Sequence, residues 1–335
     1  MTIRVAINGF GRIGRCVLRS AWNDPEIEFV HINDLTSDDM LAHLLKYDSV
    51  HGKFSESVEA VEGGLNIGGK FVHTSATRDP AELPWTERKI DVVLECTGFF
   101  LTAEGAGKHL QAGAKRVVVS APGKSASIKT IVVGVNDHEL RNDMKIVSNA
   151  SCTTNCLAPI AKVLDETFGI ESGLMTTIHA YTGNQNILDA PHKDARRARA
   201  AAMNMIPTTT GAAKAVAKVL PQLDGKLNGM AIRVPTPNVS LVDLVFTSKS
   251  TLTVEAINEA LKKAAEGPLK GVLGATNDPV VSVDMVGNPN SSIADLGITQ
   301  TMGDNMAKVL SWYDNEWGFS NRMIDLTKKL VALES

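Results

Sequence analysis

Short apolar runs separated by segments with helical spacing fill the first half of the chain. The runs that predict strands are residues 3–8, 27–34, 91–98, 116–122, 130–135 and 145–150. The segments that predict helices are residues 10–22, 38–47 and 103–114. Buried strands that alternate with helices are typical of βαβ units and a mostly parallel sheet. Residues 58–75 contain two Gly-Gly breaks and predict a small antiparallel insertion.

The second half has longer, partly alternating apolar segments. Residues 239–246 form an apolar, partly alternating segment that suits a strand of an antiparallel sheet with one covered face. Residues 253–267 predict a helix that starts at a threonine and stops at a glycine. A further strand is predicted at 307–314 and a closing amphipathic helix at 319–333. The pattern predicts an α/β chain, with a parallel-sheet domain followed by an α+β domain that has a mixed or antiparallel sheet.

The boundary between the two halves has no linker rich in proline, glycine or serine. We place it in the short connection 148–152, so that residues 1–151 form the first domain and 152–316 the second. A chain of 335 residues suits two domains better than a single core. Domain junctions are common places for ligand sites, so the segment around residue 150 draws attention.

Composition and charge narrow the function classes. With 44% hydrophobic and 21% charged residues, the chain has the balance of a globular protein. A net charge of −3 argues against nucleic acid as the main ligand. We see neither a signal-peptide pattern nor a membrane-length apolar run. Four cysteines are too few for a disulfide framework, which predicts a cytoplasmic protein with reduced thiols.

A glycine turn follows the first predicted strand. Gly9, Gly11 and Gly14 form the pattern GxGxxG at the start of a predicted helix, and the second strand ends at Asp34. Such glycines allow a tight turn, close approach of a pyrophosphate and close packing of helix on strand, while the acid binds the ribose hydroxyls. A carboxylate at Asp34 favours NAD over NADP. A turn that binds nothing, or another nucleotide such as FAD, stays open at this point.

The stretch SNASCTTNCLAP, residues 148–159, carries two cysteines four residues apart. The apolar positions that follow have helical spacing, and Ser151 or Asn149 could cap the helix. Cys152 then lies in the first turn, where free N–H groups and the helix dipole stabilise a thiolate. Cys156 lies one turn deeper and is expected to pack in the core. Pro159 falls past the first turn, where proline is awkward in a helix.

A reactive thiol at Cys152 is the interpretation that the pattern favours. A disulfide to Cys156 conflicts with the compartment and with the geometry of residues one helical turn apart. Zinc would need two more ligands, and no second Cys or His pair is near. A catalytic thiol needs a base, and His179, at a point where an apolar strand turns polar, is the best candidate. A packed histidine is the alternative.

Three further segments suit phosphate. The basic run 196–199 contains three arginines, although a solvated charged face is the better explanation for any one of them. Thr210 and Gly211 precede a helix, where hydroxyl and N–H groups point at one spot, as they also do in an ordinary cap. Arg233 lies within an apolar strand and needs a partner, either a phosphate or an internal carboxylate.

The motifs together resemble one family. The glycine turn and the segments SNASCTTNCLAP, HAYTGNQ, RRARAA, PTTTGAAKAV, RVPTPN and SWYDNEWGFSNR occur in the order found in phosphorylating, glycolytic glyceraldehyde-3-phosphate dehydrogenases. The resemblance covers nearly the whole chain. It implies an N-terminal Rossmann NAD-binding domain, a catalytic domain, a closing helix at about 317–335 that packs on the first domain, and a homotetramer.

The resemblance also implies roles for individual residues. Cys152 is the nucleophile and His179 its base, acting on glyceraldehyde 3-phosphate through a hemithioacetal and a thioester that inorganic phosphate cleaves. The residues implied to bind substrate phosphate or inorganic phosphate are Ser151, Cys152, Thr153, Thr182, Arg197, Thr210, Gly211 and Arg233. The residues implied to contact NAD, with the three turn glycines, are Arg12, Ile13, Asp34, Arg78, Ser120 and Asn315. No metal is implied.

Two rival functions share these features. Erythrose-4-phosphate dehydrogenase is a near relative with the same cysteine and histidine, and it depends less on inorganic phosphate. A non-catalytic NAD-binding redox sensor, or an RNA-binding partner, would keep the fold and the oxidisable thiol without turnover. The mild acidity argues against RNA.

Overall fold

The computed structural model describes residues 2–333 and divides into two compact units. Unit 1 comprises residues 2–131, 137–150 and 320–333, and unit 2 comprises residues 132–136 and 151–319. The division near residue 150 falls between Ala150 and Ser151. Within the described residues, no helix is both long and apolar enough to cross a membrane.

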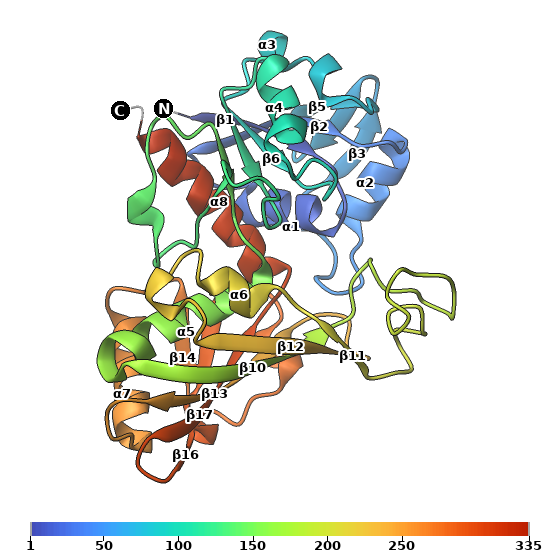
Figure 1. The fold of residues 1–335 in the computed structure, drawn as a ribbon. Helices are drawn as coiled ribbons and strands as arrows, with labels where there is room; N and C mark the ends of the chain where they lie inside the picture. Colours follow the sequence, from blue (N-terminus) through green and yellow to red (C-terminus); the bar gives the residue numbers. More distant parts are fainter. Residues whose placement is uncertain (1, 334–335) are drawn as a thin grey trace. The chain divides into compact units, whose positions relative to one another are not determined.

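Unit 1 is built on a nine-stranded sheet of order β3-β4-β5-β2-β1-β6-β7-β9-β8 (Figure 1). Its strands are β1 (Ile3–Asn8), β2 (Ile27–Asn33), β3 (Val58–Val61), β4 (Gly64–Ile67), β5 (Lys70–Ser75), β6 (Val92–Glu95), β7 (Arg116–Val119), β8 (Lys129–Thr130) and β9 (Ile146–Ser148). Neighbouring strands from β5 through β8 are parallel, and β3, β4 and β5 pair antiparallel. The predicted parallel sheet and its small antiparallel insertion are confirmed.

The helices of unit 1 include those predicted at 10–22, 38–47 and 103–114, together with a short helix at 85–88 that was not predicted. They are α1 (Arg12–Ala21), α2 (Asp38–Lys46), α3 (Trp85–Arg88), α4 (Ala103–Gln111) and α8 (Trp317–Ala332), of which the first three residues belong to unit 2. The apolar side of α8 buries Met323, Leu326 and Leu330 completely. Its Lys328 pairs with Asp24 at 2.6 Å and so fixes the helix on unit 1.

β1 lies between β2 and β6, so the strand order reverses direction beside it. In open α/β sheets, ligands bind outside the carboxyl ends of the strands at such a switch point. The glycine turn follows β1, and the Cys96–Thr97 segment follows β6. The topology therefore places both segments where a dinucleotide would bind.

Unit 2 contains an eight-stranded mixed sheet of order β11-β12-β10-β13-β17-β15-β14, with β16 paired to β17 (Figure 1). Its strands are β10 (Ile170–Ala180), β11 (Ile206–Thr209), β12 (Leu227–Val234), β13 (Ser240–Ser248), β14 (Leu273–Thr276), β15 (Ser292–Asp295), β16 (Gln300–Met302) and β17 (Met306–Tyr313). Its helices are α5 (Cys152–Phe168), α6 (Ala212–Val216) and α7 (Val254–Glu266). Alternating burial along β13 and β17 shows one covered face, and α5 packs on this sheet.

Two local expectations need correction or completion. The strand predicted at 130–135 is wrong beyond Thr130, because Asn136 Oδ1 accepts the Val132 N–H at 2.8 Å and Gly134 has a φ of 82°, so the chain turns. Pro159 does not end α5, which runs through it as far as Phe168. Gly169 then stops the helix in the left-handed region, with a φ of 71°.

Candidate active site

Cys152 is the first residue of α5, and the local sequence explains its place. Ser151 is the N-cap in extended conformation, and its Oγ accepts the Thr154 N–H at 3.1 Å. The prediction of a Ser151 cap is confirmed. Ala150, just before the cap, has a φ of 59°, an uncommon value for a residue with a Cβ. Strained backbone of this kind is frequent at functional sites.

His179 lies beside Cys152 although 27 residues separate them. It is buried near the end of β10, and its Nε2 lies 3.5 Å from Cys152 Sγ. The structure therefore brings together the predicted thiol and the predicted base, at the range of a sulfur hydrogen bond.

Arg233 adds a positive charge to this pair. β10 and β12 run parallel in a register that sets His179 opposite Arg233. Arg233 Nη1 lies 2.7 Å from His179 Nδ1 and 2.9 Å from the Ala180 carbonyl oxygen. A guanidinium only donates. His179 Nδ1 also lies 2.7 Å from the Ala180 carbonyl oxygen. When Nδ1 carries no proton, it accepts a hydrogen bond from Arg233. When Nδ1 carries a proton, it donates a hydrogen bond to the Ala180 carbonyl.

Burial sets the protonation of the resting pair. It raises the pKa of the Cys152 thiol, and the nearby charge of Arg233 opposes the rise only in part. Burial and then Arg233 lower the pKa of His179 to about 3. Burial thus opposes the thiolate that the helix start was expected to stabilise. Both directions favour a thiol beside a neutral imidazole in the resting pair.

Tyr313 is a neighbour that the sequence reasoning missed. The fully buried Tyr313 hydroxyl lies 2.8 Å from Thr153 Oγ1 and 2.8 Å from Thr177 Oγ1. Its ring meets that of His179 edge-on, with centroids 5.9 Å apart. This contact joins the first turn of α5 to the strand that carries the histidine. The only advance signal was its place in the motif SWYDNEWGFSNR, which supported the resemblance alone.

Of the three arginines in the basic run, Arg197 acts electrostatically on the candidate active site. Its charge adds to the lowering of the pKa of His179 and of Arg233, after the larger effect of burial. Its Nε lies 3.1 Å from Thr208 Oγ1 and 3.6 Å from Asp194. The other two arginines have different partners, because Arg196 donates to the Pro207 carbonyl and Arg199 pairs with Asp189.

Three other residues predicted to bind phosphate, Thr182, Thr210 and Gly211, have hydrogen-bond partners outside the Cys152–His179 pair. Thr182 Oγ1 donates to Asn184 Oδ1 at 2.8 Å. Thr210 Oγ1 accepts the Ala212 N–H at 3.2 Å, and Gly211 caps α6. Within residues 2–333, no hydrogen bond joins these three to Cys152 or His179. Of the predicted set, the described contacts bring together Cys152, Thr153, His179 and Arg233, and Arg197 acts on His179 and Arg233 through its charge.

A second candidate site lies within unit 1, at the switch point of its sheet. A cavity of about 490 Å³ is lined by Asn8, Gly9, Gly11, Asn33, Asp34, Leu35, Thr77, Arg78, Cys96, Thr97, Phe99 and Phe100. Gly9 has a φ of 91°, and a Cβ there would lie 2.7 Å from Thr97 N. A Cβ on Gly14 would lie 2.3 Å from the Gly9 carbonyl oxygen. Both glycines are therefore required by close packing.

Four of the residues predicted to contact NAD line this cavity, namely Gly9, Gly11, Asp34 and Arg78. Asp34 Oδ2 accepts the Phe10 N–H at 2.7 Å, which ties the end of β2 to the glycine turn. Ile13 and Gly14 lie in the first turn of α1, and Ser120 follows β7. Asn315 belongs to unit 2, where its Oδ1 accepts from Ser240 Oγ at 2.9 Å.

Arg12, the remaining residue predicted to contact NAD, has a partner of its own. Its Nη1 lies 2.5 Å from Asp48 Oδ2, and its Nη2 lies 3.2 Å from Asp48 Oδ1. Although burial opposes ionisation of Asp48, hydrogen bonds from Arg12, His51 and Val50 lower its pKa to about 2. The pair fixes the Arg12 side chain at the start of α1.

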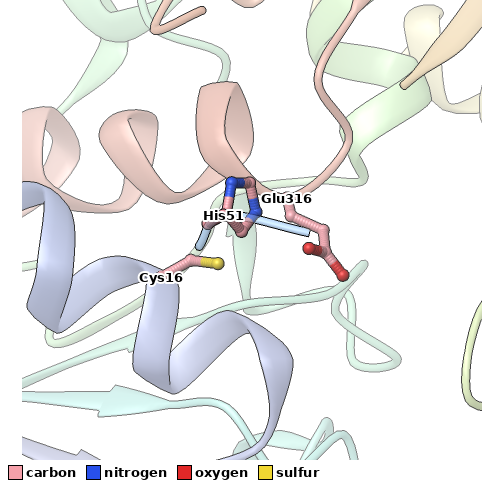
Figure 2. Close-up of side chains that lie close together, drawn as sticks. All are labelled: Cys16, His51 and Glu316. Atoms are coloured by element: carbon pink, nitrogen blue, oxygen red, sulfur yellow. The ribbon is translucent and has the colours of Figure 1, made fainter. Parts of the chain in front are cut away.

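One group of potential metal ligands is present in the described part of the chain. Figure 2 shows Cys16 of α1 beside His51. The ligand atoms of these two residues lie within 4.8 Å of one another. The third labelled side chain, Glu316, belongs to unit 2. Two ligands are half of the four that a structural zinc site needs, so we assign no metal to the Cys16–His51 pair.

Comparison with known proteins matches both halves of the chain. A family model described as "Glyceraldehyde 3-phosphate dehydrogenase, NAD binding domain" matches residues 3–103, and one described as "Glyceraldehyde 3-phosphate dehydrogenase, C-terminal domain" matches residues 151–315. Glyceraldehyde-3-phosphate dehydrogenase 1 of Bacillus subtilis is 58% identical over 327 residues, 97% of each chain. Glyceraldehyde-3-phosphate dehydrogenase of Geobacillus stearothermophilus is 57% identical over 335 residues, 99% of each chain. The chain belongs to the glyceraldehyde-3-phosphate dehydrogenase family.

Proposed function

We propose that this protein oxidises D-glyceraldehyde 3-phosphate to 1,3-bisphosphoglycerate with NAD and inorganic phosphate, as a step of glycolysis or gluconeogenesis. The observation that carries the proposal is the 3.5 Å approach of Cys152 Sγ to His179 Nε2 at a helix start, with Arg233 at 2.7 Å from the imidazole. The relatives named above are glyceraldehyde-3-phosphate dehydrogenases over nearly the full chain. A thiol, a base and a cation in contact suit acyl transfer to an anionic acceptor.

The cavity of unit 1 fits NAD. Because Gly9 has no side chain, the glycine turn can lie close to the Thr97 backbone, where a Cβ would clash. The start of α1 offers N–H groups to a pyrophosphate. Asp34 would accept from ribose hydroxyls and repel a 2′-phosphate. The other residues proposed to hold NAD are Gly11, Arg12, Ile13, Gly14, Arg78, Ser120 and Asn315. When bound, NAD supplies the two-electron oxidation of the substrate carbon.

The chain's own groups carry the rest of the reaction. Cys152 Sγ attacks the aldehyde carbon while its proton passes through His179 to the new hydroxyl, giving a hemithioacetal. His179 Nε2 takes that proton back when the carbon is oxidised to a thioester. Inorganic phosphate then attacks the thioester carbon, and the sulfur leaves and regains a proton from His179. Because burial and then Arg233 lower the pKa of His179 to about 3, its imidazole is neutral at rest and has a nitrogen free to accept the first proton.

Two anions must be bound, the substrate's phosphate and the attacking phosphate. We propose that Arg233 and Arg197 supply the charge for them, because both act electrostatically on His179. Hydroxyl and N–H groups of Ser151, Thr153, Thr182, Thr210 and Gly211 would complete the two sites. We further propose that residues 1–151 with the helix at about 317–335 form the NAD-binding domain and residues 152–316 the catalytic domain.

Omission of phosphate tests the proposal. On mixing enzyme, NAD and glyceraldehyde 3-phosphate, we expect sustained NADH formation with inorganic phosphate. Without phosphate we expect a single burst of about one NADH per active site, because the thioester has no acceptor. Equal turnover in both mixtures would make water the acceptor and contradict the proposal, as would absence of NADH in both.

We also propose that the protein is a homotetramer in the cytoplasm. Large apolar side chains are exposed on the sheet of unit 2, with Leu174 of β10 at 68%, Met230 of β12 at 40% and Met302 of β16 at 69%. Exposed apolar groups of this kind favour self-association. Light scattering should give four times the chain mass of 35.8 kDa, and a monomer mass would refute the assembly. A chain with only four cysteines, too few for a disulfide framework, suits a reducing compartment, which fractionation of the producing cells would test.

A further inference from the structure

A carboxylate with no solvent exposure lies at the end of β6, next to the cavity of unit 1. Glu95 Oε2 accepts from Asn8 Nδ2 at 2.6 Å and lies 2.9 Å from His109 Nε2. Its Oε1 accepts from the Thr97 N–H at 2.8 Å and from the Thr97 hydroxyl. Asn8 Nδ2 and the Thr97 N–H can only donate, and the Thr97 hydroxyl donates as well, so these contacts suit a carboxylate.

His109 does not neutralise this anion. The Trp85 indole N–H, which can only donate, lies 3.0 Å from His109 Nδ1, so that nitrogen is bare. The ring's single proton is therefore on Nε2, where it is donated to Glu95. Trp85, Glu95 and His109 are all completely buried. Glu95 is thus a buried charge stabilised by hydrogen bonds and by no cation among these contacts.

Two of the residues that donate hydrogen bonds to Glu95 form part of the cavity wall. Asn8 and Thr97 both line the cavity, one from the end of β1 and the other just past β6. Asn8 Oδ1 in turn accepts from Asn33 Nδ2 at 2.7 Å, and Asn33 also lines the cavity. The Thr97 N–H that Glu95 fixes is the atom that a Cβ on Gly9 would meet at 2.7 Å.

We infer that Glu95 is a positioning residue for NAD, which sets the spacing between the glycine turn and the Thr97 segment without touching the cofactor. The inference rests on the proposed assignment of this cavity to NAD. The reason is geometric. The Glu95 carboxylate accepts hydrogen bonds from Asn8 at the end of β1 and from Thr97 just past β6, and so it holds these two segments together. A neutral group of the same shape cannot accept all of these hydrogen bonds. Glutamine in its place would aim an NH₂ group at one of these donors, because an amide carries only one acceptor oxygen.

Glu95→Gln should raise the Kd for NAD by roughly tenfold or more, the cost of unpairing hydrogen bonds to a charged group. The KM for NAD should rise with it, while kcat at saturating NAD falls far less. Arg116→Met is the matched control. Arg116 is also fully buried, on the neighbouring β7, but it donates to the carbonyls of Asn142 and Met144. Both variants should melt earlier, and only Glu95→Gln should lose NAD affinity.

The outcomes separate this inference from the proposed function. If the wild-type protein binds no NAD, the proposed function fails. If it binds NAD and Glu95→Gln binds within about twofold of it, or Arg116→Met loses as much affinity, the positioning role is refuted. Should Glu95→Gln fail to fold, Thr97→Val and Thr97→Ser replace it. Serine keeps the hydroxyl donor, so Thr97→Ser should bind NAD at least about threefold more tightly than Thr97→Val; equal affinities would refute the role.

Discussion

Replacing Cys152 with serine is expected to lower kcat by at least about 10⁴-fold, the scale on which loss of a catalytic nucleophile acts. A serine hydroxyl is a far weaker acid than a thiol, and the same burial that raises the pKa of Cys152 disfavours an alkoxide still more. An ester, moreover, transfers its acyl group to phosphate less readily than a thioester. Initial rates of NADH formation at saturating substrates measure the loss, and an equilibrium titration with NAD should show cofactor binding intact.

Cys156→Ser is the matched control, because it makes the same atomic change one helical turn away. Cys156 is completely buried, with its Sγ 3.6 Å from Ser292 Oγ and from the Ser311 carbonyl oxygen. Serine can take over these hydrogen bonds, so activity should stay within about threefold of the wild type. Near-normal turnover by Cys152→Ser would refute the nucleophile assignment. Loss of turnover in a folded Cys156→Ser protein would show that the two cysteines are misassigned.

Features that depend on a few neighbouring residues could be predicted from the sequence. The Ser151 cap, the first-turn position of Cys152 and the glycine turn with Asp34 at the end of the next strand are all local patterns. The two sheets followed from the period of the apolar positions. The strand predicted at 130–135 failed, since its apolar run hides a turn held by the Asn136 side chain and by the positive φ of Gly134.

Features that depend on strand register could not be predicted. Arg233 faces His179 because β10 and β12 run parallel in one particular register, and 54 residues separate the two side chains. Tyr313 reaches Thr153 across 160 residues of chain. Without these neighbours, the helix dipole was the only visible influence on Cys152, and it suggested a thiolate. The structure adds burial, which acts in the opposite direction.

His179→Asn is expected to lower kcat by about 10²- to 10⁴-fold, the usual contribution of a positioned general base. Asparagine keeps a polar side chain at this position, but it cannot take a proton from Cys152. Initial rates measure the loss, and His43→Asn is the control, since His43 is an exposed residue of α2 in unit 1. A His179→Asn rate within about threefold of the wild type would remove His179 from the mechanism.

The pH profile of the same variant tests the role of the base more sharply. Without His179, attack depends on thiolate that forms by loss of a proton to solvent. Burial raises the pKa of the Cys152 thiol, so this thiolate becomes abundant only on the alkaline side of an ordinary cysteine. The rate of His179→Asn should therefore keep rising with pH beyond about 8.5, the ordinary thiol value. A rate that is flat from neutral pH upward would mean that Cys152 is already ionised without its base, and the resting thiol–imidazole pair would be wrong.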